Sequence, residues 1–85
     1  MARTDTRLGT VEDVLAGRPE HVRETFRALR AVILDADPDA VETPSPTESA
    51  VSYGIGPRKM KEGYAYLMPL AARVNLGFYR GVALP

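Results

Sequence analysis

The chain has 85 residues with eleven basic and eleven acidic side chains, so it fits one domain with a single core and carries no formal net charge. The neutral total argues against nucleic acid as a partner, and the absence of cysteine excludes disulfides and thiolate chemistry. No apolar run approaches the roughly 20 residues of a membrane helix, and the first residues lack a signal-peptide pattern, so we expect a cytoplasmic protein without membrane contact.

The first half of the sequence predicts a short helix followed by a long one. Residues 1–9 mix charged and small polar side chains, and we expect them to form a flexible lead-in. Thr10 can cap a helix of at most two turns, which Gly17 should end. Pro19 is a suitable first residue for a second helix, and the 3,4 spacing of apolar residues predicts that this helix covers about 19–35. The residues on its apolar face are Val22, Phe26, Leu29 and Ile33.

The second half of the sequence predicts a connector and then strands. Three prolines in DADPDAVETPSPTES forbid a long helix, so we interpret residues 35–49 as a connector. The apolar period then drops to two in residues 51–55, and the runs 64–68 and 74–79 continue in that way. These runs predict a three-stranded antiparallel meander. The expected fold is α+β, a single domain over residues 10–85 in which the short and long helices pack on a small antiparallel sheet.

The segment GIGPRKMKEG, which joins two of the predicted strands, combines glycine with three basic residues. A phosphate-binding loop would need consecutive backbone N–H groups ahead of a helix. Here Pro57 removes one donor, and the third glycine of a dinucleotide-binding loop is missing. We therefore interpret the segment as the charged tip of a hairpin, with Gly63 as a turn residue.

Three arginines recur along the long helix, at Arg23, Arg27 and Arg30, behind a short helix and a turn. This order is similar to that of a helix-turn-helix. However, an acidic residue lies three positions before each of the first two arginines and is expected to pair with it. We interpret the arginines as a solvated helix face and not as a nucleic-acid surface.

Groups that could perform catalysis are sparse. His21 is the sole histidine, and its position beside Val22 places it on the solvent side of the apolar stripe. A triad mechanism would require this residue as its base. No serine or threonine has the glycine-flanked setting of a nucleophile. The sequence therefore favours a protein that is not an enzyme.

Acidic residues after the long helix offer oxygen ligands of the kind that iron, calcium or magnesium accept. The candidate metal ligands are Asp35, Asp37, Asp39 and Glu42. Their spacing does not follow the calcium-binding EF-hand loop. The alternative is that Asp37 caps a single turn and that the other three carboxylates lie in an exposed loop.

One face of the predicted sheet is rich in small and polar residues. Glycines within strands weaken β-structure, so another interaction must offset their cost. One interpretation is a shallow groove floored by backbone that binds a small molecule, and the other is tight bending or close backbone packing. The candidate groove residues are Tyr53, Gly54, Gly56, Asn75, Gly77 and Tyr79.

Three segments, AVILDADPDAVET, AVSYGIGPRKMKEGYAYLMPL and VNLGFYRGVALP, together resemble the YdhG-like family of small bacterial domains. The resemblance covers residues 10–85 and implies helices packed on an antiparallel sheet, with no established catalytic residues. We expect a non-enzymatic binding or interaction domain of this kind. Some members resemble frataxin, which implies an iron chaperone as the alternative, and the candidate groove suggests a small-molecule carrier as a further one. Members continue beyond the equivalent of Pro85, so we expect either a short member or one that lacks a C-terminal segment.

The last predicted strand, residues 74–79, should lie at an open edge of the sheet. Its outer N–H and C=O groups would be unpaired, and open edges pair with other chains unless charge, proline or a bulge prevents it. Val74, Leu76 and Phe78 would add an apolar row beside this edge. We therefore expect a homodimer or higher assembly through the C-terminal strand, closed by two-fold symmetry.

Overall fold

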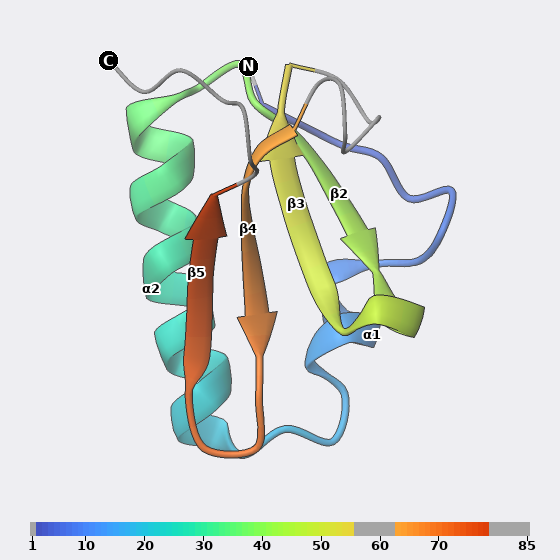
Figure 1. Cartoon of the computed structure of the whole chain (residues 1–85), viewed down its shortest axis with the longest axis vertical. Helices are drawn as coiled ribbons and strands as arrows, with labels where there is room; N and C mark the ends of the chain where they lie inside the picture. Colours follow the sequence, from blue (N-terminus) through green and yellow to red (C-terminus); the bar gives the residue numbers. More distant parts are fainter. Residues whose placement is uncertain (1, 56–62, 79–85) are drawn as a thin grey trace.

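The structure, a computed structural model, describes residues 2–55 and 63–78. It confirms the α+β fold, with two helices on one side of a five-stranded sheet (Figure 1). The predicted hairpin tip, with Arg58, Lys59 and Lys61, lies outside the described residues. In chain order the elements are β1 (Arg3–Thr4), α1 (Val11–Leu15), α2 (Glu20–Ala36), β2 (Val41–Ser45), the single 3-10 turn η1 (Pro46–Glu48), β3 (Ala50–Gly54), β4 (Gly63–Pro69) and β5 (Val74–Phe78).

Both helices form for the local reasons that the sequence indicates. At the start of α1, the Thr10 hydroxyl accepts a hydrogen bond from the Asp13 N–H at 3.1 Å, and the Asp13 carboxylate accepts one from the Thr10 N–H at 2.9 Å. This reciprocal pair satisfies two N–H groups that the helix leaves free. Gly17 follows α1 with a φ of 76°, the left-handed conformation that glycine favours. Pro19 is the N-cap of α2, one position before the predicted one.

The sheet is larger than the predicted meander. Its strand order is β1-β2-β3-β4-β5, with β1 parallel to β2 and every other neighbour antiparallel. The connector prediction was wrong for Val41–Ser45, since this segment is strand β2 and all five residues are buried. Pro44 fits there because β1 pairs only with Val41 and Glu42, so one side of β2 is open at the proline. The lead-in prediction was also wrong for Arg3–Thr4, which forms β1.

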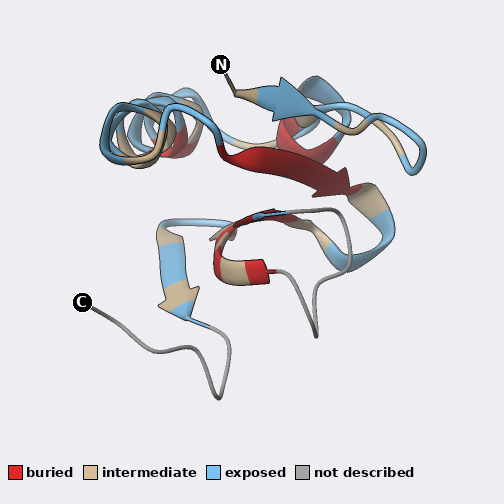
Figure 2. Ribbon diagram, turned by 90° about the horizontal axis from the view of Figure 1, so that it is seen from above, coloured by how far each residue is buried: buried red, intermediate tan, exposed pale blue. Residues whose placement is uncertain are grey.

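The hydrophobic core lies between the helices and one face of the sheet, where Figure 2 shows the buried parts of both layers facing one another. Helix α1 lies against β2 and β3, and α2 lies against β4 and β5. Leu29 and Ile33 are partly buried and extend the apolar face of α2, as the periodicity predicts. In the part of the chain that the structure describes, no helix has the length and apolarity needed to cross a membrane. The central core residues are Val14, Leu15, Phe26, Val51, Tyr53 and Leu67.

Candidate functional site

The four carboxylates predicted as metal ligands do not converge. Asp35 and Asp39 are exposed, Asp37 ends α2, and Glu42 is buried in β2. Over the described ranges, no group of three or more acidic, histidine or cysteine side chains could hold a metal ion. The prediction of one acidic cluster was therefore wrong, because it assumed a loop where the chain forms a strand that turns Glu42 toward the core.

Glu42 is the centre of a buried polar cluster that joins four elements. Its side chain is 1% exposed and accepts four hydrogen bonds. Arg30 of α2 donates from Nε at 2.5 Å and from Nη2 at 3.0 Å, so the guanidinium binds both carboxylate oxygens. Thr4 of β1 donates at 3.0 Å and Tyr53 of β3 at 2.8 Å. Each oxygen thus accepts two bonds, which gives the buried charge the pairing that it requires.

The cluster also shifts the pKa of two side chains, Arg30 and Tyr53. The hydrogen bond to Glu42 raises the pKa of Arg30, and the nearby carboxylate charge acts in the same direction. Burial, followed by the charge of Glu42 and its hydrogen bond, raises the pKa of Tyr53. The tyrosine therefore remains a neutral donor at neutral pH. The cluster holds α2 and β1 against β2 and β3. Both carboxylate oxygens of Glu42 already accept hydrogen bonds from within the protein.

Two of the three arginines of α2 pair with acidic residues of other elements. Arg27 donates to Glu12 of α1 at 3.3 Å, and both side chains are largely exposed. Arg30 pairs with Glu42, as described above. The sequence predicted pairing with acidic residues of the same helix. In the structure, Glu12 of α1 and Glu42 of β2 lie beside the arginines instead. That side of α2 therefore faces α1 and β2.

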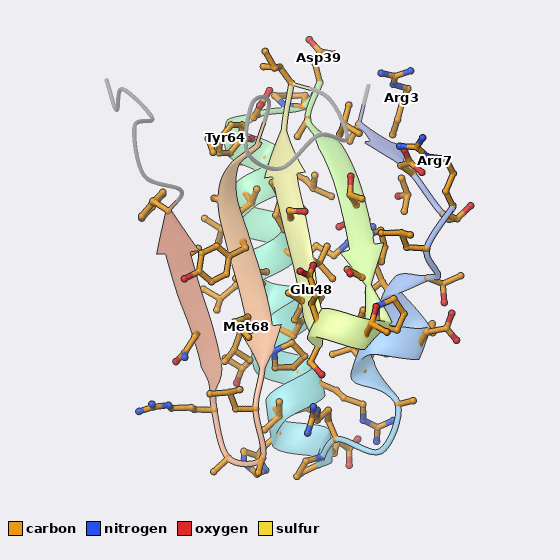
Figure 3. All side chains as sticks on the ribbon, turned by 45° about the vertical axis from the view of Figure 1, so that its right-hand side comes forward. Arg3, Arg7, Asp39, Glu48, Tyr64 and Met68 are labelled. Atoms are coloured by element: carbon orange, nitrogen blue, oxygen red, sulfur yellow. The ribbon has the colours of Figure 1, made fainter. Side chains whose placement is uncertain are left out.

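A second polar contact lies at the end of α2 and depends on a β-bulge. The register between β3 and β4 shifts at Tyr53 and Gly54, which leaves Tyr64 as the extra residue of β4. A bulge of this kind redirects a side chain. Here the Tyr64 ring packs against the core cluster, and its hydroxyl donates to the Asp37 carboxylate at 2.7 Å. Figure 3 shows Tyr64 at the same end of the molecule as Asp39, where α2 turns into β2.

We expect Tyr64→Phe to lower the free energy of unfolding by about 1–2 kcal/mol at pH 7, because it removes a hydrogen bond to a charged group. Burial and then the bond to Asp37 raise the pKa of Tyr64 above its ordinary value of 10.0. The unfolded chain therefore releases this proton first, so the contribution of Tyr64 is present below pH 10 and is lost as the pH rises above it. Urea unfolding should show the difference between the parent and Tyr64→Phe narrowing above pH 10. A constant difference would contradict the assignment.

The predicted ligand groove is divided between two faces of the sheet. Tyr53 faces the helices and belongs to the core, which corrects its assignment to the groove. Gly77 lies opposite Tyr66 in the register of β4 and β5, and a Cβ atom placed on Gly77 would lie 2.2 Å from the Tyr66 ring. The ring thus covers Gly77, as the close-packing interpretation requires. Gly54 is buried in β3 and Asn75 is exposed in β5. Gly56 and Tyr79 lie outside the described residues.

Strand β5 forms one edge of the sheet, on the left of Figure 1. Within residues 2–55 and 63–78 it pairs with β4 alone. Leu76 is 46% exposed and Phe78 is 56% exposed, which is unusual for two large apolar residues on the face that carries the core. The sequence indicates this edge strand and its apolar residues. It does not indicate how much of Leu76 and Phe78 remains exposed beside α2.

Sequence reasoning missed the polar cluster, because Thr4 and Arg30 are separated from Glu42 by 38 and 12 residues. The one available signal was the position of Glu42 between Val41 and Thr43, two β-branched residues of the kind that favours strands. Two features of the described residues thus stand out. One is the buried polar cluster around Glu42, and the other is the edge strand β5 with its exposed Leu76 and Phe78.

Comparisons with protein-family models, curated proteins and solved structures gave no match.

Proposed function

We propose that this chain is a cytoplasmic, non-enzymatic interaction domain of the YdhG-like kind that forms a homodimer through strand β5. The observation that carries the proposal is the exposure of Leu76 and Phe78 beside an edge strand. Burial of such side chains is the main driving force of protein association. Pairing of the β5 edge with another strand would also satisfy its outer backbone groups.

The two edge strands of the sheet, β1 and β5, differ in length and in charge. Strand β1 has two residues, both exposed, and one of them is Arg3. Short length and charge are common protections of an edge strand. Strand β5 has five residues, VNLGF, and none is charged. The β5 edge therefore offers a longer row of backbone groups without electrostatic protection.

Neither alternative function has an observation of equal weight. An iron chaperone would use the acidic residues, but Glu42 is buried and bonded to Arg30, and the three aspartates are not gathered around a common point. A small-molecule carrier would use the glycine-rich face, but the Tyr66 ring occupies the space over Gly77. Pairing at the β5 edge would need neither the release of Glu42 from Arg30 nor a movement of the Tyr66 ring.

We expect the unmodified chain to sediment as a dimer at tens of micromolar and Phe78→Lys to sediment as a monomer. The lysine places a charge in the apolar row that the paired strands would bury, without an opposite charge beside it. Phe78 is 56% exposed, so the fold should tolerate the change. Leu8→Lys is the matched control, since Leu8 is 60% exposed and lies in the segment between α1 and β1, the edge strand opposite β5. A monomeric unmodified chain, or an equal effect of Leu8→Lys, would overturn the proposal.

A further inference from the structure

The register of β4 and β5 shows which side chains of the edge strand point toward the helices. Leu76 lies opposite Leu67, a residue of the core cluster, and directly opposed residues point to the same face of a sheet. Leu76 therefore lies on the helix-bearing face, together with Val74 and Phe78, two positions before and after it. Asn75 and Gly77 lie on the other face.

We infer, on the basis of the proposed homodimer, that two copies of β5 pair antiparallel about a two-fold axis at Leu76, with both α2 helices on the same face. Leu76 is the middle residue of the strand, so this register pairs all five residues of each copy. Val74 then lies opposite Phe78 of the second copy, and Asn75 lies opposite Gly77. A shift by one residue would place the apolar rows of the two copies on opposite faces.

The side chains of β5 suit a second copy better than a charged partner segment. Since none of its residues is charged, the two-fold arrangement brings no like charges together. The larger Phe78 meets the smaller Val74 on the apolar face. On the other face, Asn75 meets Gly77, which the Tyr66 ring covers. Each pair therefore combines residues of complementary size, without a buried unpaired charge.

Helix α2 leaves room for this arrangement. Arg30 reaches toward β2, and Val32 lies about 200° further around the helix, so Val32 is on the side of α2 that faces the β5 edge. Val32 is 65% exposed. Because α2 lies against both β4 and β5, each helix would lie about one strand spacing from the two-fold axis, so the two helices would stand about two strand spacings apart, roughly 10 Å. Directly packed helices stand about 8–10 Å apart. The two helices would therefore fit side by side without overlap, with Val32 of each on the side that faces the other copy.

Single-cysteine variants test the register directly, because the chain has no cysteine of its own. Directly opposed residues in antiparallel strands have Cα atoms roughly 4.5–5.5 Å apart, within the range that a disulfide spans. Under mild oxidation at tens of micromolar, we expect Leu76→Cys to become mostly covalent dimer on a non-reducing gel. Phe78→Cys alone should remain mostly monomeric on the gel, since its partner position holds Val74. The double variant Val74→Cys with Phe78→Cys should cross-link.

The outcomes separate this inference from the proposed function. Leu8→Cys is the control for random collision, since Leu8 is exposed and follows β1, the edge strand opposite β5. If sedimentation shows a dimer but Leu76→Cys cross-links no more than Leu8→Cys, the register is overturned while the homodimer stands. If Phe78→Cys alone cross-links as well as Leu76→Cys, the register is likewise overturned. If the unmodified chain sediments as a monomer, both proposals fail.

Discussion

Glu42→Ala should lower the free energy of unfolding by about 3–5 kcal/mol, measured by urea unfolding at pH 7. The change removes the acceptor for Arg30, Thr4 and Tyr53 at once. The Tyr53 hydroxyl would then be buried without a partner, and the Arg30 guanidinium would keep its charge in a half-buried position. Since a chain of this length has a total stability of about 4–13 kcal/mol, the variant should be close to unfolding at 37 °C.

Glu12→Ala is the matched control for this result. Glu12 also pairs with an arginine, Arg27, but both side chains are at least half exposed. Exposed pairs contribute about 0–1 kcal/mol, so this variant should lose no more than that. Glu42→Gln provides a second comparison, because it keeps the shape of the side chain and removes its charge. Equal losses for Glu42→Ala and Glu12→Ala would show that the cluster around Glu42 contributes no more than a surface ion pair.

Phe26→Ala should also cost about 3–5 kcal/mol, because it removes a fully buried aromatic ring from the centre of the core. The neighbouring change Arg27→Ala should cost well under 1 kcal/mol, since that side chain is half exposed and its ion pair lies at the surface. Urea unfolding followed by circular dichroism measures both values. If Phe26→Ala unfolds the chain completely, Phe26→Leu should still show a loss larger than that of Arg27→Ala.

Equal losses for these two helix variants would contradict the placement of α2. The apolar face of the helix would then point away from the sheet, and the contact of Arg30 with Glu42 could not form. The Phe26 and Glu42 variants therefore both test how α2 is placed on the sheet. Phe26 reports on the apolar contact of α2 with the sheet, and Glu42 reports on the polar contact next to it.

The helices could be predicted from the sequence because the interactions that specify them are local. Thr10 and Asp13, three residues apart, form the cap that begins α1. The apolar face of α2 follows from spacings of three and four residues, and Phe26 occupies the centre of that face in the structure. The edge position of β5 was also predictable, since it depends on the order of the last strands along the chain.

The position of β2 and the polar cluster around Glu42 depended on the tertiary structure. Pro44 makes the segment unsuited to a strand by local rules, and it is tolerated because β1 is too short to pair with it. The bonds from Glu42 to Thr4, Arg30 and Tyr53 join residues 11 to 38 positions apart. Local sequence specified both helices and the apolar alternation of the strands, because neighbouring residues decide those features. Only the folded chain decided which carboxylate is buried, because burial depends on what lies across the sheet.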